Sequence, residues 1–180
     1  MKTPSAQTFV VTPPPAYASM LLVLLGGVLP LAIIAVLWLW APPAQLSGVG
    51  PALVVVPAVV AALLLAMKRR SVELRDGVLD VRGALFRHRV AVTQLDLARA
   101  RIVDLAERTE LRPILKTGGM SVPGFHAGHF RLREKLGKAF CLVTDRHRVL
   151  WLPLRDGKGQ LLISLEQPQA LLDALKSMRG

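Results

Sequence analysis

Two histidines separated by two residues are the first candidate for chemistry in this sequence. His126 and His129 form an H-x-x-H pattern, and imidazole is a common zinc ligand. The surrounding stretch is rich in glycine and proline, which predicts a loop, and a loop gives this spacing no fixed face. No cysteine or carboxylate nearby in the sequence completes a ligand set. We therefore expect no metal site and no cofactor.

Three further groups lack the neighbours that their chemistry would need. The glycine-rich residues 117–124 have no following Lys-Ser or Lys-Thr, so they are interpreted as a turn with left-handed glycines and not as a phosphate-binding loop. Cys141 lies in an apolar run, which predicts a buried and inert thiol. Asp145 and His147 fall in a predicted hairpin turn with no suitable serine nucleophile. We expect no catalytic residues and no enzymatic activity.

Charge divides the chain into two chemically different parts. Lys2 alone of the 23 Lys and Arg residues precedes position 68, and none of the 12 acidic residues does. Residues 1–67 thus carry +1, and residues 68–180 carry 22 − 12 = +10. The 52% apolar content excludes a disordered chain, and the single cysteine excludes a disulfide-stapled fold. These features predict a membrane segment followed by one soluble domain.

Two charge-free runs predict a pair of transmembrane helices. Residues 17–40 form the first run, which as a helix of 24 residues would be about 36 Å long. Residues 51–67 form the second, at the lower limit for a span. Residues 41–50 contain two prolines and two glycines, which predicts a short turn. The first run is too long for a signal peptide and lacks an A-x-A-like cleavage site.

A basic triplet directly follows the second predicted helix. The predicted turn between the two helices has no basic residue, whereas Lys68, Arg69 and Arg70 follow the second helix. Basic residues are retained on the cytoplasmic side, so both termini are predicted there. We also predict that these three residues contact the membrane surface, because the cytoplasmic leaflet is anionic. Neither predicted helix contains an ionisable residue, so we interpret the hairpin as an anchor.

The tail at residues 1–16 leaves two alternatives open. Phe9 and Val11 alternate with Thr8 and Thr12 ahead of three prolines. This pattern is typical of a half-buried edge strand. A frayed terminus is the other interpretation.

The basic part of the chain predicts an antiparallel β domain closed by a helix. Asp76-Gly77 is a strong hairpin signal between two short β-type runs. Near the end, Leu171, Leu172, Leu175 and Met178 recur at helical spacing after Pro168. This amphipathic helix is expected to cover an open end of a barrel. The predicted strands are residues 71–75, 78–82, 85–92, 97–105, 130–133, 138–144, 148–154 and 160–165.

Residues 112–175 resemble the bacterial pleckstrin homology family of small membrane proteins. The resemblance rests on the order and spacing of several short motifs, while residues 165–167 depart from the family's Pro and Asp. It implies a two-helix transmembrane hairpin followed by an all-β PH-like barrel or sandwich of about seven antiparallel strands, capped by a C-terminal helix. The motifs are Pro123-Gly124, Gly128, Phe130, Ala139, Thr144-Asp145, Arg148-Val149, Ser164 and Pro168.

The resemblance implies a fold more than a ligand. Pleckstrin homology domains outside bacteria often hold phosphoinositides through basic residues in and beside the first hairpin loop. Here that hairpin offers Arg75 beside Asp76, with Arg82 beyond, and the neighbouring carboxylate opposes an anion. Headgroup-specific binding is therefore not carried over.

The positive charge of residues 68–180 is interpreted as attraction to an anionic lipid surface. The basic residues are scattered among the predicted strands and form no nucleic-acid motif, so no nucleic-acid partner is expected. The expected function is non-enzymatic binding or scaffolding at the inner (cytoplasmic) membrane, with residues 68–180 as the presented domain. The alternative is an accessory subunit whose hairpin packs on the helices of a membrane protein partner.

Overall fold

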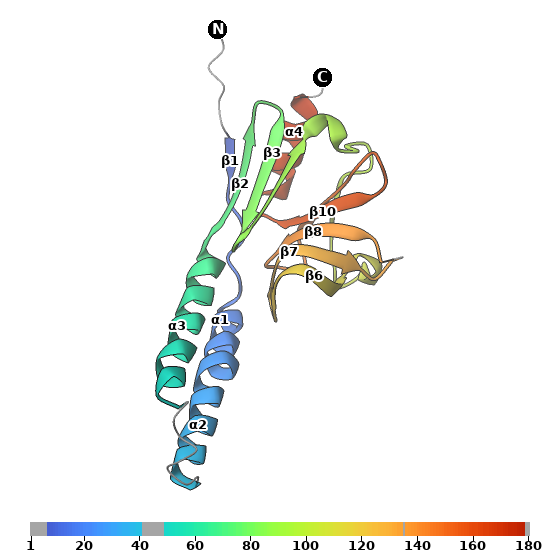
Figure 1. The fold of residues 1–180 in the computed structure, drawn as a ribbon. Coiled ribbons are helices and arrows are strands. Elements are labelled where there is room, and N and C mark those ends of the chain that lie inside the picture. The colour runs from blue at the N-terminus through green and yellow to red at the C-terminus, as the bar shows by residue number, and fades with distance from the viewer. Residues whose placement is uncertain (1–6, 41–48, 135, 179–180) are drawn as a thin grey trace.

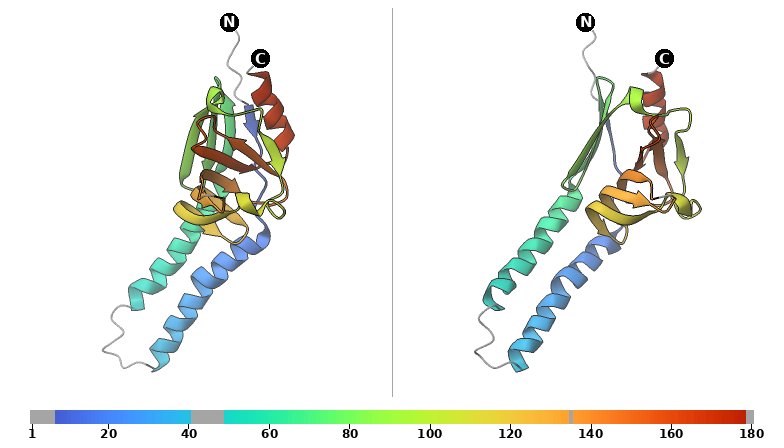
Figure 2. Two further views of the ribbon diagram at one scale, coloured as in Figure 1. Left: turned by 90° about the vertical axis from the view of Figure 1, so that its right-hand side faces the viewer. Right: turned by 45° about the vertical axis from the view of Figure 1, so that its right-hand side comes forward.

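A computed structural model of the chain describes residues 7–40, 49–134 and 136–178 (Figure 1). Two long apolar helices extend from one end of a domain built from two β-sheets and a C-terminal helix. Figure 2 shows the two sheets as separate layers. The predicted fold class, with its helical hairpin, β-sandwich and closing helix, is confirmed.

The first long helix contains a wide turn at its glycines. Helix α1 (Ala16–Val23) continues through the π-helical segment η1 (Leu24–Val28) into α2 (Leu29–Trp40). Pro30 lacks an N–H group and so cannot complete the regular helical ladder at this point. A Cβ atom added at Gly26 or Gly27 would lie 3.6 Å from Val60 in the second helix. The glycine segment thus faces Val60 at ordinary packing distance.

The second long helix, α3 (Val49–Lys68), leads directly into the domain. Ala16–Trp40 and Gly50–Lys68 are both long and apolar enough to cross a membrane. None of the residues in α2 is buried within the chain. The uncovered apolar surface indicates that these helices associate with a membrane.

The first sheet has four antiparallel strands in the order β1-β2-β3-β4. They are β1 (Gln7–Phe9), β2 (Arg70–Arg75), β3 (Val78–Gly83) and β4 (Phe86–Ala91). Alternation along β2 and β3 sends Val72, Leu74, Leu79 and Val81 into the core. In β1, Gln7 pairs with Leu74, which makes this segment an edge strand.

The second sheet has six strands in the order β5-β9-β10-β8-β7-β6. Strands β8 and β9 are buried along almost their whole length, because this sheet has covered surfaces on both faces. The strands are β5 (Arg101–Val103), β6 (Pro113–Val122), β7 (Phe125–Leu132), β8 (Lys138–Val143), β9 (Val149–Pro153) and β10 (Gly159–Ser164).

The strand count and one pairing differ from the prediction of about seven antiparallel strands. The described residues form ten strands, and β10 lies between β8 and β9, where it pairs with β8 in parallel. The predicted strand at 97–105 is reduced to β5. The predicted turn at 117–124 is wrong for residues 117–122, which belong to β6. The pairing of β6 with β7 has two register shifts, one between Pro113 and Leu115 and one between Lys116 and Gly118.

Helix α4 (Pro168–Ser177) packs on the core as its spacing predicts. Leu171, Leu172 and Leu175 are buried, whereas Met178 follows the helix and is 44% exposed. Ser164, just before α4, is fully buried. Its hydroxyl accepts the N–H groups of Thr144 and Asp145 at 3.1 and 3.2 Å and donates to the Asp145 carbonyl at 2.8 Å. These bonds join β10 to the turn after β8.

Candidate membrane-surface site

The basic triplet lies at the junction between α3 and the first sheet. Lys68 is the last residue of α3, and Arg70 is the first residue of β2. The Arg69 N–H donates to the Ala66 carbonyl at 3.0 Å, and the Arg70 guanidinium donates to the Met67 carbonyl at 3.2 Å. Partial burial lowers the pKa of Arg70 from its usual value. The three cations are therefore held where the apolar helix ends.

A tight turn between β3 and β4 lies beside this junction. Arg70 pairs with Gly83 across the sheet, and the Ala84 N–H donates to the Arg69 carbonyl at 2.8 Å. Ala84 has a φ of 54°, a conformation that two-residue hairpin turns require. Leu85, at the tip, is 73% exposed. No signal in the sequence places this turn at the end of α3.

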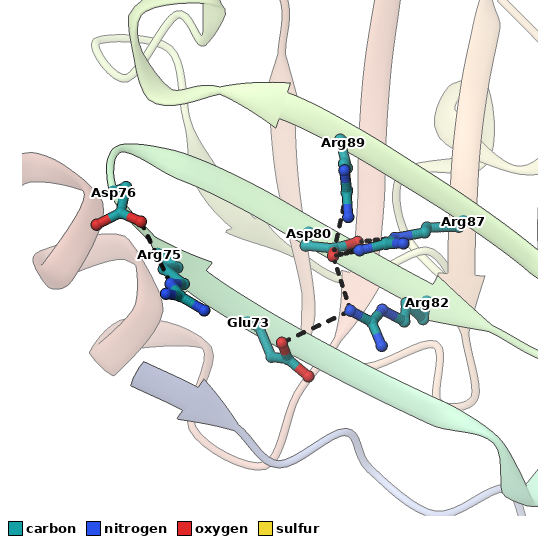
Figure 3. Close-up of polar contacts among 7 residues, drawn as sticks. All are labelled: Glu73, Arg75, Asp76, Asp80, Arg82, Arg87 and Arg89. Carbon is teal, nitrogen blue, oxygen red and sulfur yellow. Dashed lines mark hydrogen bonds and ion pairs between the residues drawn. The ribbon is translucent and has the colours of Figure 1, made fainter. Parts of the chain in front are cut away.

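The half-buried carboxylate of Asp80 contacts several arginines on the outer face of the first sheet (Figure 3). Asp80 accepts the Arg87 Nε at 2.9 Å and the Arg82 Nη2 at 3.0 Å, and Arg87 Nη2 makes a further close contact. The Arg89 Nε is 3.5 Å from the same carboxylate. The Asp80 side chain is only 13% exposed. The sheet register that creates this cluster is not visible in the sequence.

These contacts keep Asp80 ionised. Hydrogen bonds from Arg87 hold the pKa of Asp80 well below its usual range, although burial opposes this shift, and Arg82 lowers the pKa further. The pKa of Arg87 is raised in turn, chiefly by its hydrogen bond to Asp80. Asp80 thus fixes the positions of Arg82 and Arg87 throughout the neutral pH range.

The first hairpin loop of the domain lies away from the long helices. The turn between β2 and β3 is at the opposite end of these strands from the α3 junction (Figure 1). Here the Arg75 Nε is 3.2 Å from Asp76, and both side chains are exposed. The charge of Asp76 offsets that of Arg75, so this loop has no excess positive charge to attract an anion.

The two histidines of the H-x-x-H pattern lie on a strand and not in the predicted loop. Residues three apart in a strand point to opposite faces. His126 Nδ1 is 2.9 Å from the Ser121 hydroxyl, and burial, with the nearby Arg146, lowers the pKa of His126. The His129 ring instead packs edge-on against Phe140. In the described part of the chain, no three His, Cys, Asp or Glu residues are placed to hold a metal ion.

Cys141 is part of the core, and hydrogen bonds stabilise the turn after β8. Burial raises the pKa of the Cys141 thiol, which is fully buried. The Asp145 carboxylate accepts the His147 backbone N–H at 3.1 Å. His147 Nδ1 is 2.9 Å from the Asp104 carboxylate, and this contact raises the pKa of His147. The contact with Asp145 thus stabilises the turn after β8, and the contact with Asp104 sets the orientation of the His147 ring.

A scan against protein-family models matches residues 70–179 to the bacterial PH domain. The match begins at the first residue of β2 and extends through α4. Comparison with the curated proteins and with the solved structures finds no match. The matched region covers more than half of the chain and includes the nine strands β2 to β10 of the sandwich. The chain therefore belongs to the bacterial PH domain family.

Proposed function

We propose that this chain is a non-enzymatic binding or scaffolding protein of the inner (cytoplasmic) membrane. Two helices anchor it, both termini are cytoplasmic, and the PH-like domain is presented at the membrane surface. Lys68, Arg69 and Arg70 contact that surface. The PH domain family is generally non-catalytic, which supports a binding role.

The observation that carries the proposal is the short, doubly restrained connection between helices and domain. Only Arg69 separates α3 from β2. Before α1, the Thr144 hydroxyl donates to the Thr12 carbonyl at 2.7 Å. A Cβ at Gly124, in the turn between β6 and β7, would lie 2.7 Å from Pro15 and 2.9 Å from the Tyr17 hydroxyl. A domain fastened at both helix ends has little freedom to leave the membrane surface.

Cysteine labelling in sealed, right-side-out membrane vesicles tests the anchor and its orientation. Gly50→Cys places a thiol at the start of α3, where an added Cβ meets no atom within 4 Å. We expect a membrane-impermeant maleimide to label it without permeabilisation, because the basic triplet retains the opposite end in the cytoplasm. The matched Ser177→Cys thiol in α4 should react only after permeabilisation. The native Cys141 is buried and serves as an unreactive background.

The reverse labelling pattern would contradict the proposed orientation. Labelling of both variants without permeabilisation, in vesicles shown to be sealed, would contradict a two-span anchor.

An accessory-subunit role is the second candidate, because α2 buries no residue against the rest of the chain. Its apolar surface could be covered by helices of a partner as well as by lipid. A stoichiometric membrane protein that remains bound in mild detergent would favour this alternative.

A further inference from the structure

A shallow pocket of about 540 Å³ lies between the end of α3 and the β3–β4 turn. Five cationic residues line it, together with the exposed tip residue Leu85. Within the described residues no carboxylate lines the pocket; Asp80 and Glu73 lie behind the arginines that they pair with. The cationic residues are Lys68, Arg69, Arg70, Arg82 and Arg87.

The ion pairs with Asp80 leave the pocket arginines able to bind an anion. Arg82 and Arg87 retain side-chain exposures of 45% and 43%. A guanidinium has five N–H donors, and the contacts with Asp80 engage only some of them. The half-buried Asp80 carboxylate therefore holds two guanidiniums in place while their remaining donors stay available.

The position of the pocket selects the kind of anion, and this step rests on the proposed membrane anchoring. Lys68 is the last residue of the apolar helix, so the pocket opens at the level of lipid headgroups. Leu85 is 73% exposed at the rim, and the hydrogen bond from Ala84 to Arg69 ties its turn to the helix end. Cations beside an exposed leucine suit a molecule with a phosphate and an apolar tail.

We propose that this pocket binds the phosphate of one anionic phospholipid, with Leu85 in contact with its acyl chains. Five cations against the two carboxylates behind them leave the pocket positively charged. A zwitterionic headgroup has no net charge to offset this excess, whereas the single negative charge of phosphatidylglycerol offsets part of it. The site uses the β3–β4 turn and the end of α3, at the opposite end of the sheet from the Arg75-Asp76 loop.

Native mass spectrometry of the full chain in detergent micelles tests the site. We expect titration with dioctanoyl-phosphatidylglycerol to yield one tightly retained lipid per chain, while dioctanoyl-phosphatidylcholine binds at least about tenfold more weakly. Glycerol phosphate, which lacks acyl chains, should not displace the lipid at equal concentration. Displacement by glycerol phosphate would show a site for soluble phosphates and overturn the lipid assignment.

Two double variants separate the pocket from general charge. Lys68→Gln with Arg69→Gln removes two exposed pocket cations and should weaken phosphatidylglycerol binding by roughly 10- to 30-fold. Arg75→Gln with Lys176→Gln removes the same charge from the β2–β3 turn and α4, and should retain wild-type binding. Equal affinities for the two double variants would overturn the proposal.

Leu85→Gln provides a test that leaves the charge unchanged. Its exposed side chain supports no core packing, and we expect weaker retention of phosphatidylglycerol with an unchanged melting temperature. Unchanged lipid retention in this variant would contradict the acyl-chain contact.

The labelling experiment with Gly50→Cys distinguishes failure here from failure of the proposed function. A chain that is labelled as expected but shows no preference for phosphatidylglycerol overturns the lipid site and leaves the anchor standing. A chain with the wrong labelling pattern overturns the anchor, whatever lipid it retains in micelles.

Discussion

Gly128→Ala is expected to destabilise the domain by about 3–5 kcal/mol, a large part of the roughly 5–15 kcal/mol that stabilises a typical fold. Gly128 has a φ of 114°, which side-chain-bearing residues rarely adopt. A Cβ at this position would lie 2.6 Å from the Gly118 carbonyl oxygen and 2.6 Å from the Gly119 Cα. Both obstacles are backbone atoms of β6, so relief requires the strand to move. The midpoint of thermal unfolding of the full chain in detergent measures the effect.

Gly157→Ala is the matched control. Gly157 also has a positive φ, of 68°, but an added Cβ meets no atom within 4 Å. This variant should be destabilised only by the conformational cost of a side chain at positive φ, about 1 kcal/mol. Similar melting temperatures for the two variants would contradict the close approach of β6 and β7.

Leu175→Ala is expected to cost about 2–5 kcal/mol, because it leaves a cavity in the core under α4. Leu175 is fully buried, with Leu171 and Leu172 beside it in the same cluster. A loss of this size should lower the melting temperature of the full chain by several degrees. Lys176→Ala changes the exposed neighbour and should have little effect. Equal and small effects would show that α4 does not close the core.

The helices and the closing segment were predictable because their signals are local. Long runs without charge specify apolar helices, and three leucines at helical spacing specify the buried side of α4. Asp76-Gly77 likewise marks the β2–β3 turn, where both residues adopt positive φ. Each of these features depends on residues close together in the chain.

The second sheet was harder to predict because its pattern depends on distant partners. Thr117, Gly118 and Gly119 have a turn-like composition, yet pairing with β7 holds them in an irregular strand. Strand β10 lies between β8 and β9, antiparallel to β9 and parallel to β8. No local pattern in the sequence encodes this arrangement. The same dependence on distant partners explains why the local sequence predicts a loop at His126 and His129, which lie on β7.

Only the basic residues at the end of α3 could be predicted from the sequence as part of the site. The position of Lys68, Arg69 and Arg70 after an apolar run indicated a membrane-surface contact from sequence, which remains a prediction. Arg82 and Arg87 join them only through the strand register, which pairs the two residues across β3 and β4. The exposed Leu85 carried no distinguishing signal, because a lone apolar residue in a short turn is common.

The depth of two spin labels in a lipid bilayer tests whether the domain is held with its β3–β4 turn at the membrane surface. Leu85→Cys and Arg75→Cys place labels on opposite ends of the first sheet, and Cys141 is buried. In bilayers of phosphatidylcholine and phosphatidylglycerol, we predict that the label at position 85 collides mainly with oxygen and the label at position 75 mainly with a water-soluble nickel complex. Equal access of both labels to the nickel complex would contradict this placement of the domain.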